Sequence, residues 1–222
     1  MVSSQPTSQL PDLRSQIPAL TQQLPVNSSI SRIYITGAAG SGVSTLGANL
    51  ASVLSFPVFD VDDYFWLPTN PRFTAKRPID ERVSLLKADL ERAKMESGGW
   101  VLSGSMDNWG EAIMEDVEYV IFVYTETDVR MKRLSEREFK RFGERIKEGG
   151  DMYAGSVNFM AWAEKYDDPD SGVSRSRVRH EKWLSELRVP AVKLHGGEEK
   201  MVVLRKALES LGRDAKKETE EE

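Results

Sequence analysis

The sequence predicts an α/β protein, a three-layer sandwich in which a five-stranded parallel sheet lies between two layers of helices. Five short runs rich in Val, Ile, Tyr and Phe alternate along the chain with longer segments of helical apolar spacing. The run Tyr119–Tyr124 is apolar throughout, which is typical of a parallel strand covered on both faces. A glycine-rich turn joins the first run to the first helical segment, so strand, turn and helix follow one another directly.

The five predicted strands share β-branched and aromatic residues. In chain order they are Arg32–Thr36, Pro57–Val61, Trp100–Ser103, Tyr119–Tyr124 and Pro190–Leu194. The predicted helices share apolar residues three and four positions apart, and Asp80 is expected to cap the second of them. They are Val43–Leu54, Asp80–Met95, Thr127–Phe142, Tyr153–Tyr166, Arg175–Leu187 and Glu198–Leu211. With right-handed crossovers between the strands, we expect any ligand to bind at the carboxyl ends of the strands.

The 222 residues suit one domain with two tails. Residues 1–29 are rich in Ser, Gln and Pro and are expected to form a disordered leader. A transit peptide is the alternative, but one arginine, Arg14, is too few for a basic amphipathic helix. The domain is expected to span residues 30–212, and the charged residues 213–222 to form a disordered tail.

The composition argues against several classes of function. The formal net charge of -5, without a basic stripe, argues against nucleic-acid binding. The chain has no cysteine and only two histidines, His180 and His195, which excludes disulfides and disfavours a zinc site. No apolar run approaches the roughly 20 residues of a membrane helix. We therefore expect a cytoplasmic protein without a membrane or nucleic-acid partner.

A candidate phosphate-binding loop follows the first strand and opens the first helix. Its residues are Gly37, Ala38, Ala39, Gly40, Ser41, Gly42, Val43, Ser44 and Thr45. Glycines let successive N–H groups turn toward an anion, and the helix N-terminus adds its dipole. Ser44 stands where a hydroxyl would bind Mg²⁺. The alternative is a glycine-rich turn that binds no ligand. The position of the loop between a strand and a helix favours the first interpretation, the binding of ATP and Mg²⁺.

The loop departs from the Walker A pattern at one position, because Val43 stands where the pattern has lysine. Valine offers neither a charge nor a hydrogen-bond donor. Backbone N–H groups can still hold phosphates, but phosphoryl transfer requires stabilisation of the charge on the γ-phosphoryl oxygens. Either another cation supplies this charge, or the chain binds nucleotide without catalysis.

The stretch from Gly37 to Asp62 resembles the start of P-loop kinases of the shikimate-kinase-like and adenylate-kinase-like kinds. Its second strand ends in Asp60-Val61-Asp62, and Arg133-Leu134 with Arg137 is similar to the start of a nucleoside monophosphate kinase lid. The resemblance implies the P-loop NTPase fold, a sheet ordered 2-3-1-4-5, a helical lid at about 137–175 and ATP·Mg²⁺ as donor. Residues 103–107 match neither kind of kinase, which leaves the acceptor open.

By this resemblance Asp60 takes the metal role, Asp62 orients or deprotonates the acceptor, and Arg137 and Arg141 close over the phosphates. The alternative for the acids is a surface turn in which they have no function. The alternative for the arginines is a solvent-exposed helix face on which they pair with glutamates. The aromatic segment 64–78 either forms a wall of the acceptor pocket or covers the sheet edge. Further cations could replace the missing lysine, and they are Lys76, Arg77, Arg130, Arg133, Arg145, Arg175, Arg177 and Arg179. His180 is expected on a helix surface.

The sequence therefore predicts a kinase that transfers a phosphoryl group from ATP to a small-molecule acceptor. The acceptor is either a nucleoside monophosphate or a hydroxyl compound. A nucleotide-binding module with impaired catalysis and a plain NTP hydrolase are the alternatives, and the oligomeric state is left open.

Overall fold

The sheet has five parallel strands in the order β2-β3-β1-β4-β5, which confirms the predicted order. In the computed structural model, which describes residues 29–220, every neighbouring pair of these strands is parallel. The strands are β1 (Arg32–Gly37), β2 (Val58–Asp60), β3 (Trp100–Ser103), β4 (Tyr119–Tyr124) and β5 (Ala191–His195). All five predicted strands are present, with ends that differ by one residue at most.

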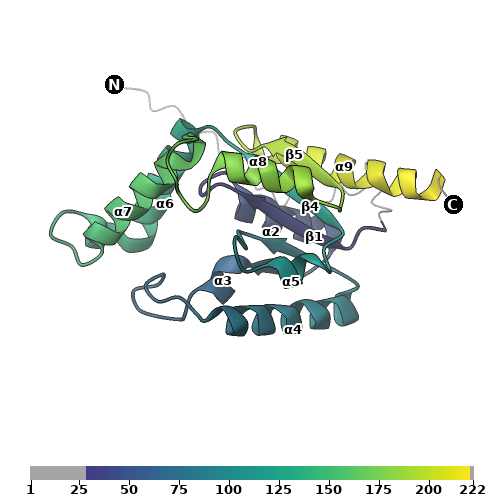
Figure 1. The fold of residues 1–222 in the computed structure, drawn as a ribbon, viewed down its shortest axis with the longest axis horizontal. Helices are drawn as coiled ribbons and strands as arrows, with labels where there is room; N and C mark the ends of the chain where they lie inside the picture. The colour runs from purple at the N-terminus through teal and green to yellow at the C-terminus, as the bar shows by residue number, and fades with distance from the viewer. Residues whose placement is uncertain (1–28, 221–222) are drawn as a thin grey trace, which may run out of the picture.

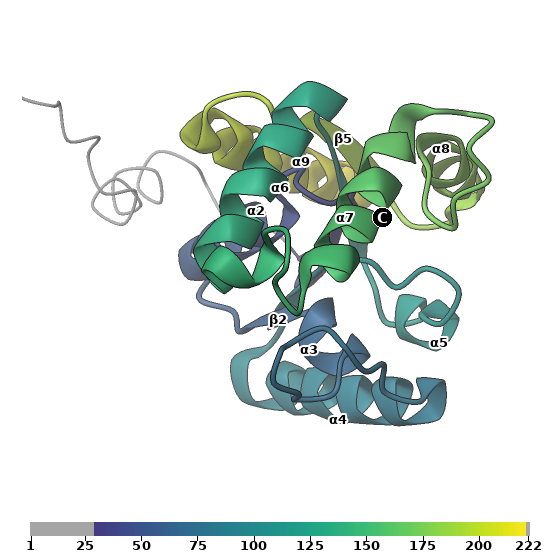
Figure 2. The same ribbon diagram turned by 90° about the vertical axis from the view of Figure 1, so that its left-hand side faces the viewer.

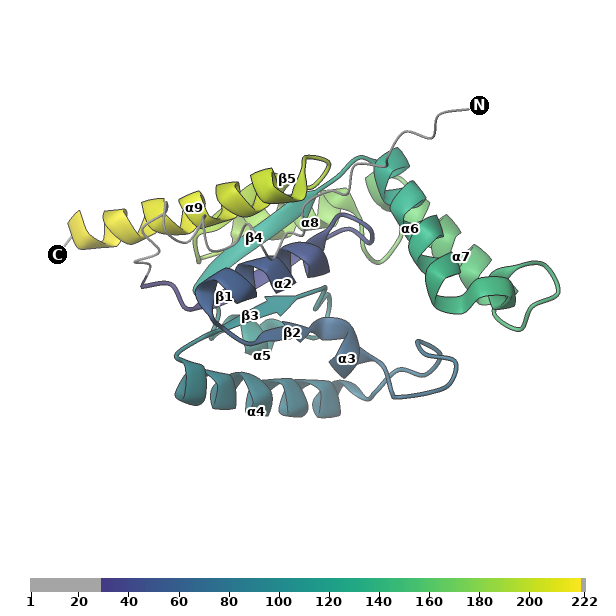
Figure 3. The same cartoon turned by 180° about the vertical axis from the view of Figure 1, so that it is seen from behind.

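Helices cover both faces of this sheet. In the described residues they are α2 (Val43–Leu54), α3 (Val61–Phe65), α4 (Ile79–Ser97), α5 (Glu111–Met114), α6 (Thr127–Phe142), α7 (Tyr153–Glu164), α8 (Arg177–Glu186) and α9 (Lys200–Glu220), with the 3-10 turns η1 (Gly143–Ile146) and η2 (Lys165–Asp167). Helices α5 and α8 lie on the near side of the sheet in Figure 1, and α2 and α9 lie on the near side in Figure 3. Helices α6 and α7 project beyond the sheet as an antiparallel pair (Figure 1).

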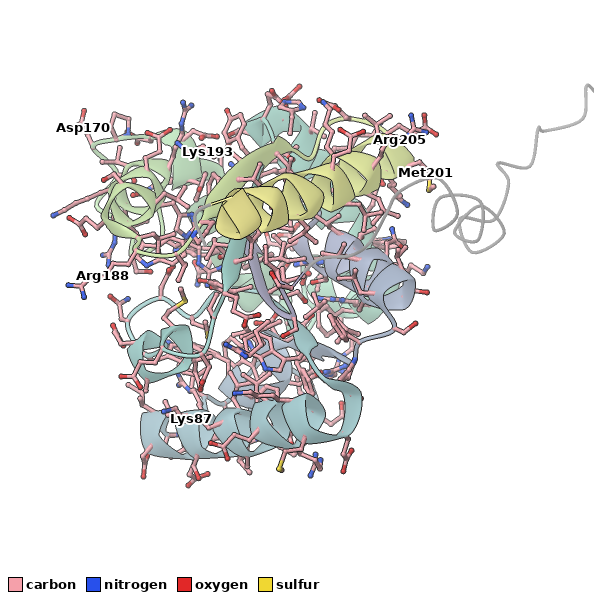
Figure 4. All side chains as sticks on the ribbon, turned by 90° about the vertical axis from the view of Figure 1, so that its right-hand side faces the viewer. Lys87, Asp170, Arg188, Lys193, Met201 and Arg205 are labelled. Carbon is pink, nitrogen blue, oxygen red and sulfur yellow. The ribbon has the colours of Figure 1, made fainter. Side chains whose placement is uncertain are left out.

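Each face of the sheet has its own apolar core. On one face Ile35 and Ile121 pack with Leu50 of α2 and Leu204 of α9. On the other face the sheet packs against α4, α5 and residues of α8, with Leu86 and Ile113 fully buried. Seen from the end opposite to α6 and α7, Lys87 of α4 and Arg205 of α9 mark the two sides of the molecule (Figure 4). Burial on both faces explains why β4 is apolar throughout.

Two element boundaries differ from the predictions for local reasons. Strand β2 ends at Asp60, because the Asp60 carboxylate accepts a hydrogen bond from the Asp62 N–H (3.0 Å) and turns the chain into α3. Helix α4 begins at Ile79 after Pro78, so Asp80 lies inside the first turn and does not cap the helix. An acid in that turn still interacts favourably with the helix dipole.

The last helix continues past its predicted end. Helix α9 runs to Glu220, where the sequence led us to expect a disordered tail at 213–222. No proline follows Gly212, and Ala, Lys and Glu have high helix propensity, so nothing in the sequence ends the helix. The predicted leader falls almost entirely on residues 1–28, outside the described residues. Among residues 29–220, no helix combines the length and the apolar character needed to cross a bilayer.

Candidate functional site

The loop between β1 and α2 has the geometry of an anion-binding turn. Gly40 and Gly42 have φ angles of +81° and +104°, which side chains rarely tolerate. A Cβ atom at Gly37 would collide with the carbonyl oxygen of Val123 on β4, so this position also requires glycine. No side chain of the described residues caps α2, so its first N–H groups are available to an anion. This site fits the phosphates of a nucleotide.

Two neighbouring elements hold the loop in place. The Thr125 hydroxyl donates to the Ser41 carbonyl oxygen (3.0 Å), and the Arg130 Nη1 atom donates to the Ala39 carbonyl oxygen (3.3 Å). Arg130 is fully buried and also donates to the carbonyl oxygens of Thr125 and Ala163. Its guanidinium is therefore engaged in holding the loop, and this arginine does not replace the missing lysine.

Arg133, one helical turn further along α6, lies beside the loop instead. Its Nη1 atom is 3.5 Å from the Gly40 carbonyl oxygen and 3.9 Å from the position that a Cβ at Gly42 would occupy. Val43 is turned the other way, since it is buried in the core between α2 and the sheet. A guanidinium group thus stands next to the turn from which the lysine is missing.

The two predicted metal ligands, Ser44 and Asp60, lie together at the mouth of the loop. The Ser44 hydroxyl donates to Oδ2 of Asp60 over 3.1 Å. The described residues contain no group of three or more His, Cys, Asp or Glu side chains that could hold a metal by themselves. One hydroxyl and one carboxylate fit Mg²⁺, because this ion commonly retains several waters and is shared with nucleotide phosphates.

Asp62 stands opposite a set of arginines. Its partial burial and the nearby Asp60 carboxylate raise the pKa of Asp62, while Arg175, Arg137 and Arg141 lower it. The residue nevertheless remains exposed to solvent, so a ligand can reach its carboxyl group. The charge of Asp62 is therefore influenced by both other predicted catalytic residues, Arg137 and Arg141, and also by Arg175.

Glu138 orients two of these arginines. It is buried, and its Oε1 atom lies 3.0 Å from Arg137 Nη2 and 3.7 Å from Arg141 Nη1. The guanidinium of Arg141 loses solvation and is repelled by Arg137, which lowers the pKa of Arg141. The alternative of arginines paired with glutamates is therefore partly right, because Arg137 and Arg141 both pair with Glu138. The charges of the same two arginines also act on Asp62. Guanidinium groups held this close favour an anion between them.

The aromatic segment forms a hairpin that reaches the end of α6. Trp66 and Lys76 form its antiparallel bridge. The Phe73 ring lies 6.4 Å from the Phe142 ring, and the Arg141 guanidinium lies 5.4 Å from the Phe73 ring centre. Figure 2 shows this hairpin and α3 below the paired helices α6 and α7. The segment therefore lies beside Arg141 at the end of α6. Its two predicted roles, as a wall of the acceptor pocket or as a cover of the sheet edge, both stay predictions.

Two residues at the site were missed by sequence reasoning. Asp107 follows β3 and binds Arg175 through Oδ2 (3.0 Å), while its Oδ1 lies 3.6 Å from His180 Nε2. His180 is 4% exposed and shares a 2.7 Å hydrogen bond with the Tyr166 hydroxyl, so the expectation of a helix-surface histidine was wrong. Burial alone would raise the pKa of Asp107, but His180 and Arg175 outweigh it and lower the pKa to about 2. The position of Asp107 at a strand's carboxyl end was the signal available in the sequence.

We expect Asp107→Asn to destabilise the fold by about 2 kcal/mol at pH 7, the value that follows from a pKa lowered to about 2. A lowered pKa stabilises the folded state above the unfolded pKa near 4, and this stabilisation fades as the pH falls toward 2. The difference between wild type and variant should therefore shrink from pH 5 to pH 3 in urea unfolding. Asp63→Asn, at an exposed ion pair with Arg72, is the control and should cost less than about 1 kcal/mol. Equal losses for the two variants would contradict the assignment.

Comparison with known proteins supports the fold and identifies a relative. No family model matches the sequence. A gluconokinase from Sinorhizobium meliloti 1021 has a similar structure, with a TM-score of 0.52, 19% identity, and coverage of 88% of this chain and 99% of that chain. A sugar kinase from Janibacter sp. HTCC2649 superposes with a TM-score of 0.48 at 16% identity, over 82% of this chain and 95% of that chain. The likeness to the gluconokinase, together with the helices on both sides of a five-stranded parallel sheet, confirms the predicted P-loop NTPase fold.

A sequence relative is much closer than these structures. The uncharacterized protein YqaC of Bacillus subtilis (strain 168) is 40% identical over 162 residues, which cover 73% of this chain and 86% of YqaC. Identity at this level over most of both chains shows common descent, and the chain belongs to the family of YqaC.

Proposed function

We propose that the protein transfers the γ-phosphoryl group of ATP to a hydroxyl group of a small acceptor. The observation that carries this proposal is that a site suited to a nucleotide lies next to a site suited to an acceptor. A phosphate loop with the Ser44–Asp60 pair at its mouth lies beside Asp62, whose charge interacts with those of Arg137, Arg141 and Arg175. One half suits a nucleotide donor, and the other suits an acceptor hydroxyl together with a charged transition state.

The loop N–H groups hold the donor phosphates, and Ser44 and Asp60 would hold the magnesium ion. Bound there, Mg²⁺ would neutralise charge on the phosphates. Asp62 accepts the proton of the acceptor hydroxyl as its oxygen attacks phosphorus and the bond to the ADP oxygen breaks. A raised pKa makes the Asp62 carboxylate a better proton acceptor. Arg137, Arg141 and Arg175 stabilise the transferring oxygens.

Arg133 takes over the charge that the loop lacks. Its guanidinium lies against Gly40 and close to Gly42, at the turn that would wrap the phosphates. Arginine suits this task because its planar donors match the geometry of phosphate oxygens. A fixed positive charge that reaches the loop from α6 supports catalysis without a lysine at position 43.

A second function has one observation in its favour. Val43 is apolar and buried in the core, so the loop itself carries no cation. A module that binds ATP and closes α6 and α7 over it, without transfer, would be compatible with this loop. The acid Asp62 and the arginines around it would then have no chemical role, which favours the enzyme.

The test combines calorimetry of ATP·Mg²⁺ binding with a transfer assay. We expect binding, and we expect production of ADP that depends on one class of acceptor, in a screen over nucleoside monophosphates, sugars and small alcohols. The non-hydrolysable analogue AMP-PNP serves as the control for binding without transfer. Binding of ATP with no acceptor-dependent ADP on any compound would reject the enzyme in favour of the binding module.

A further inference from the structure

A cavity of about 200 Å³ lies on the α5 and α8 face of the sheet, next to the proposed reaction site. Its lining residues come from β1, from the segment after β3 and from α5 and α8, and these two helices lie on the near side of the sheet in Figure 1. Its polar and aromatic lining includes Thr36, Asp107, Asn108, Arg179, His180 and Trp183. The roles proposed above use none of these six side chains.

Two deeply buried polar side chains in this lining lack hydrogen-bond partners. Thr36 is 2% exposed and its hydroxyl makes no hydrogen bond with the described residues. The Tyr34 hydroxyl interacts with Thr36, but it is already bonded to the Gly104 carbonyl oxygen and the Met106 N–H and is therefore a weak partner for the threonine. The His180 Nε2 atom likewise has no partner within hydrogen-bond length, although Asp107 Oδ1 lies 3.6 Å away and the two groups interact electrostatically. Buried polar atoms are nearly always paired, so two such atoms in one cavity indicate a polar ligand.

The charged side chains that line the cavity do not favour binding of an anion. Asp107 and Glu111 are acidic, and Arg179, the basic residue of the lining, is 3.0 Å from the Asn108 amide oxygen. An anionic ligand would meet the Asp107 carboxylate without a compensating excess of cations. Hydroxyl groups suit the lining better, because they donate to Asp107 and Asn108 and accept from His180 and Arg179.

The volume of the cavity and its aromatic wall limit the classes of ligand further. About 200 Å³ is less than the roughly 300–1,000 Å³ typical of pockets for drug-sized ligands, which argues against a nucleotide. The Trp183 indole meets the Tyr34 ring edge-on, with the ring centres 6.2 Å apart. An aromatic wall opposite polar groups suits a compact molecule with one apolar face and several hydroxyl groups.

The cavity is connected to both halves of the proposed reaction site. Thr36 directly precedes Gly37, the first residue of the phosphate loop. Asp107 is bonded to Arg175, and the charge of Arg175 acts on Asp62. Asp62 is not part of the lining, so the reacting hydroxyl of a ligand in the cavity has to extend past Arg175 to reach the proton acceptor.

We propose that this cavity holds the acceptor, and that the acceptor is a small, uncharged polyhydroxyl compound and not a nucleoside monophosphate. The inference rests on the proposed function, because the phosphoryl group has to come from ATP on the neighbouring loop. Of the two acceptor classes that the sequence leaves open, the cavity favours the hydroxyl compound.

The test measures direct binding to the full-length chain without nucleotide. Saturation-transfer NMR and calorimetry would use D-glucose and myo-inositol as uncharged probes and AMP as the anionic one. We expect at least one uncharged probe to bind, and AMP not to compete with it. Thr36→Val and Arg179→Ala should weaken that binding at least about tenfold. Arg177→Ala is the matched control, because Arg177 lies on the same helix but outside the lining, and it should change nothing.

Thr36→Val also separates a binding role from a structural one. Removing an unpaired buried hydroxyl should leave the melting temperature unchanged or higher, so weaker binding would not reflect misfolding. Absence of binding by both uncharged probes, or equal binding in Thr36→Val, would overturn the assignment of the cavity.

The outcomes also distinguish this inference from the proposed function. ADP production with AMP as acceptor, without binding of the uncharged probes, would refute the cavity and leave the kinase in place. Binding of an uncharged probe that depends on Thr36, with no transfer to any acceptor, would refute the kinase and retain the cavity as a polyol site.

Discussion

Asp62→Asn is expected to lower turnover by about 10²–10⁴-fold, the range typical of a lost general base. Asparagine has nearly the same shape but cannot accept the proton of the attacking hydroxyl. Affinity for ATP should stay the same or rise slightly, because the change removes a negative charge that faces Arg137, Arg141 and Arg175. The measurement is steady-state kinetics together with calorimetric titration of ATP·Mg²⁺.

Neighbouring acids provide the controls for this prediction. Asp63→Asn changes the next residue, which forms an exposed ion pair with Arg72, and should leave turnover within about threefold. Asp60→Asn should instead weaken binding of ATP·Mg²⁺, since Asp60 is bonded to Ser44 at the proposed metal position. If Asp62→Asn lost ATP affinity and turnover in equal measure, Asp62 would belong to the nucleotide site and not to the acceptor.

The parts of this molecule that sequence predicts well depend on local patterns. The strand Tyr119–Tyr124 and the helix Val43–Leu54 were predicted with the bounds observed, because apolar spacing and flanking glycines act within a few residues. The phosphate loop was predictable for the same reason, since Gly37, Gly40 and Gly42 all fall within a short stretch between a strand and a helix. The Ser44–Asp60 contact followed from a fold in which parallel strands end at one edge.

The parts that were missed depend on tertiary packing. Arg130 and Arg133 lie three residues apart on one helix, yet one is buried against backbone carbonyls and the other lies beside the loop. No periodicity separates them, because the difference arises from how α6 packs on the loop and α7. His180 was assigned to a surface for a similar reason, since only the docking of α8 on the sheet brings it to Asp107.

Arg133→Ala is expected to lower turnover by about 10²–10³-fold, the effect of removing one group that stabilises transition-state charge. Arg133→Lys should lose less, because it keeps the charge but not the planar pair of donors. Lys132→Ala, an exposed neighbour on the same helix, is the matched control and should have little effect. Comparable losses for Lys132→Ala and Arg133→Ala would indicate a general electrostatic effect of α6 and not a specific role of Arg133.

A second cation placed within the loop tests whether Arg133 stands in for the missing lysine. Val43→Lys restores the Walker A pattern. Although Val43 packs into the core, the long flexible stem of a lysine should let its ammonium reach out to the phosphates and take over charge stabilisation. Arg133→Ala in this background should then cost less than about tenfold, so the two changes should be strongly non-additive. Val43→Met is the uncharged control for disturbance of the core around α2, and melting temperatures would show whether each variant folds. If Arg133→Ala costs the same with Val43 and with lysine at that position, Arg133 does not do the work of the lysine, and the charge on the transferring group must come from Arg137, Arg141 and Arg175 alone.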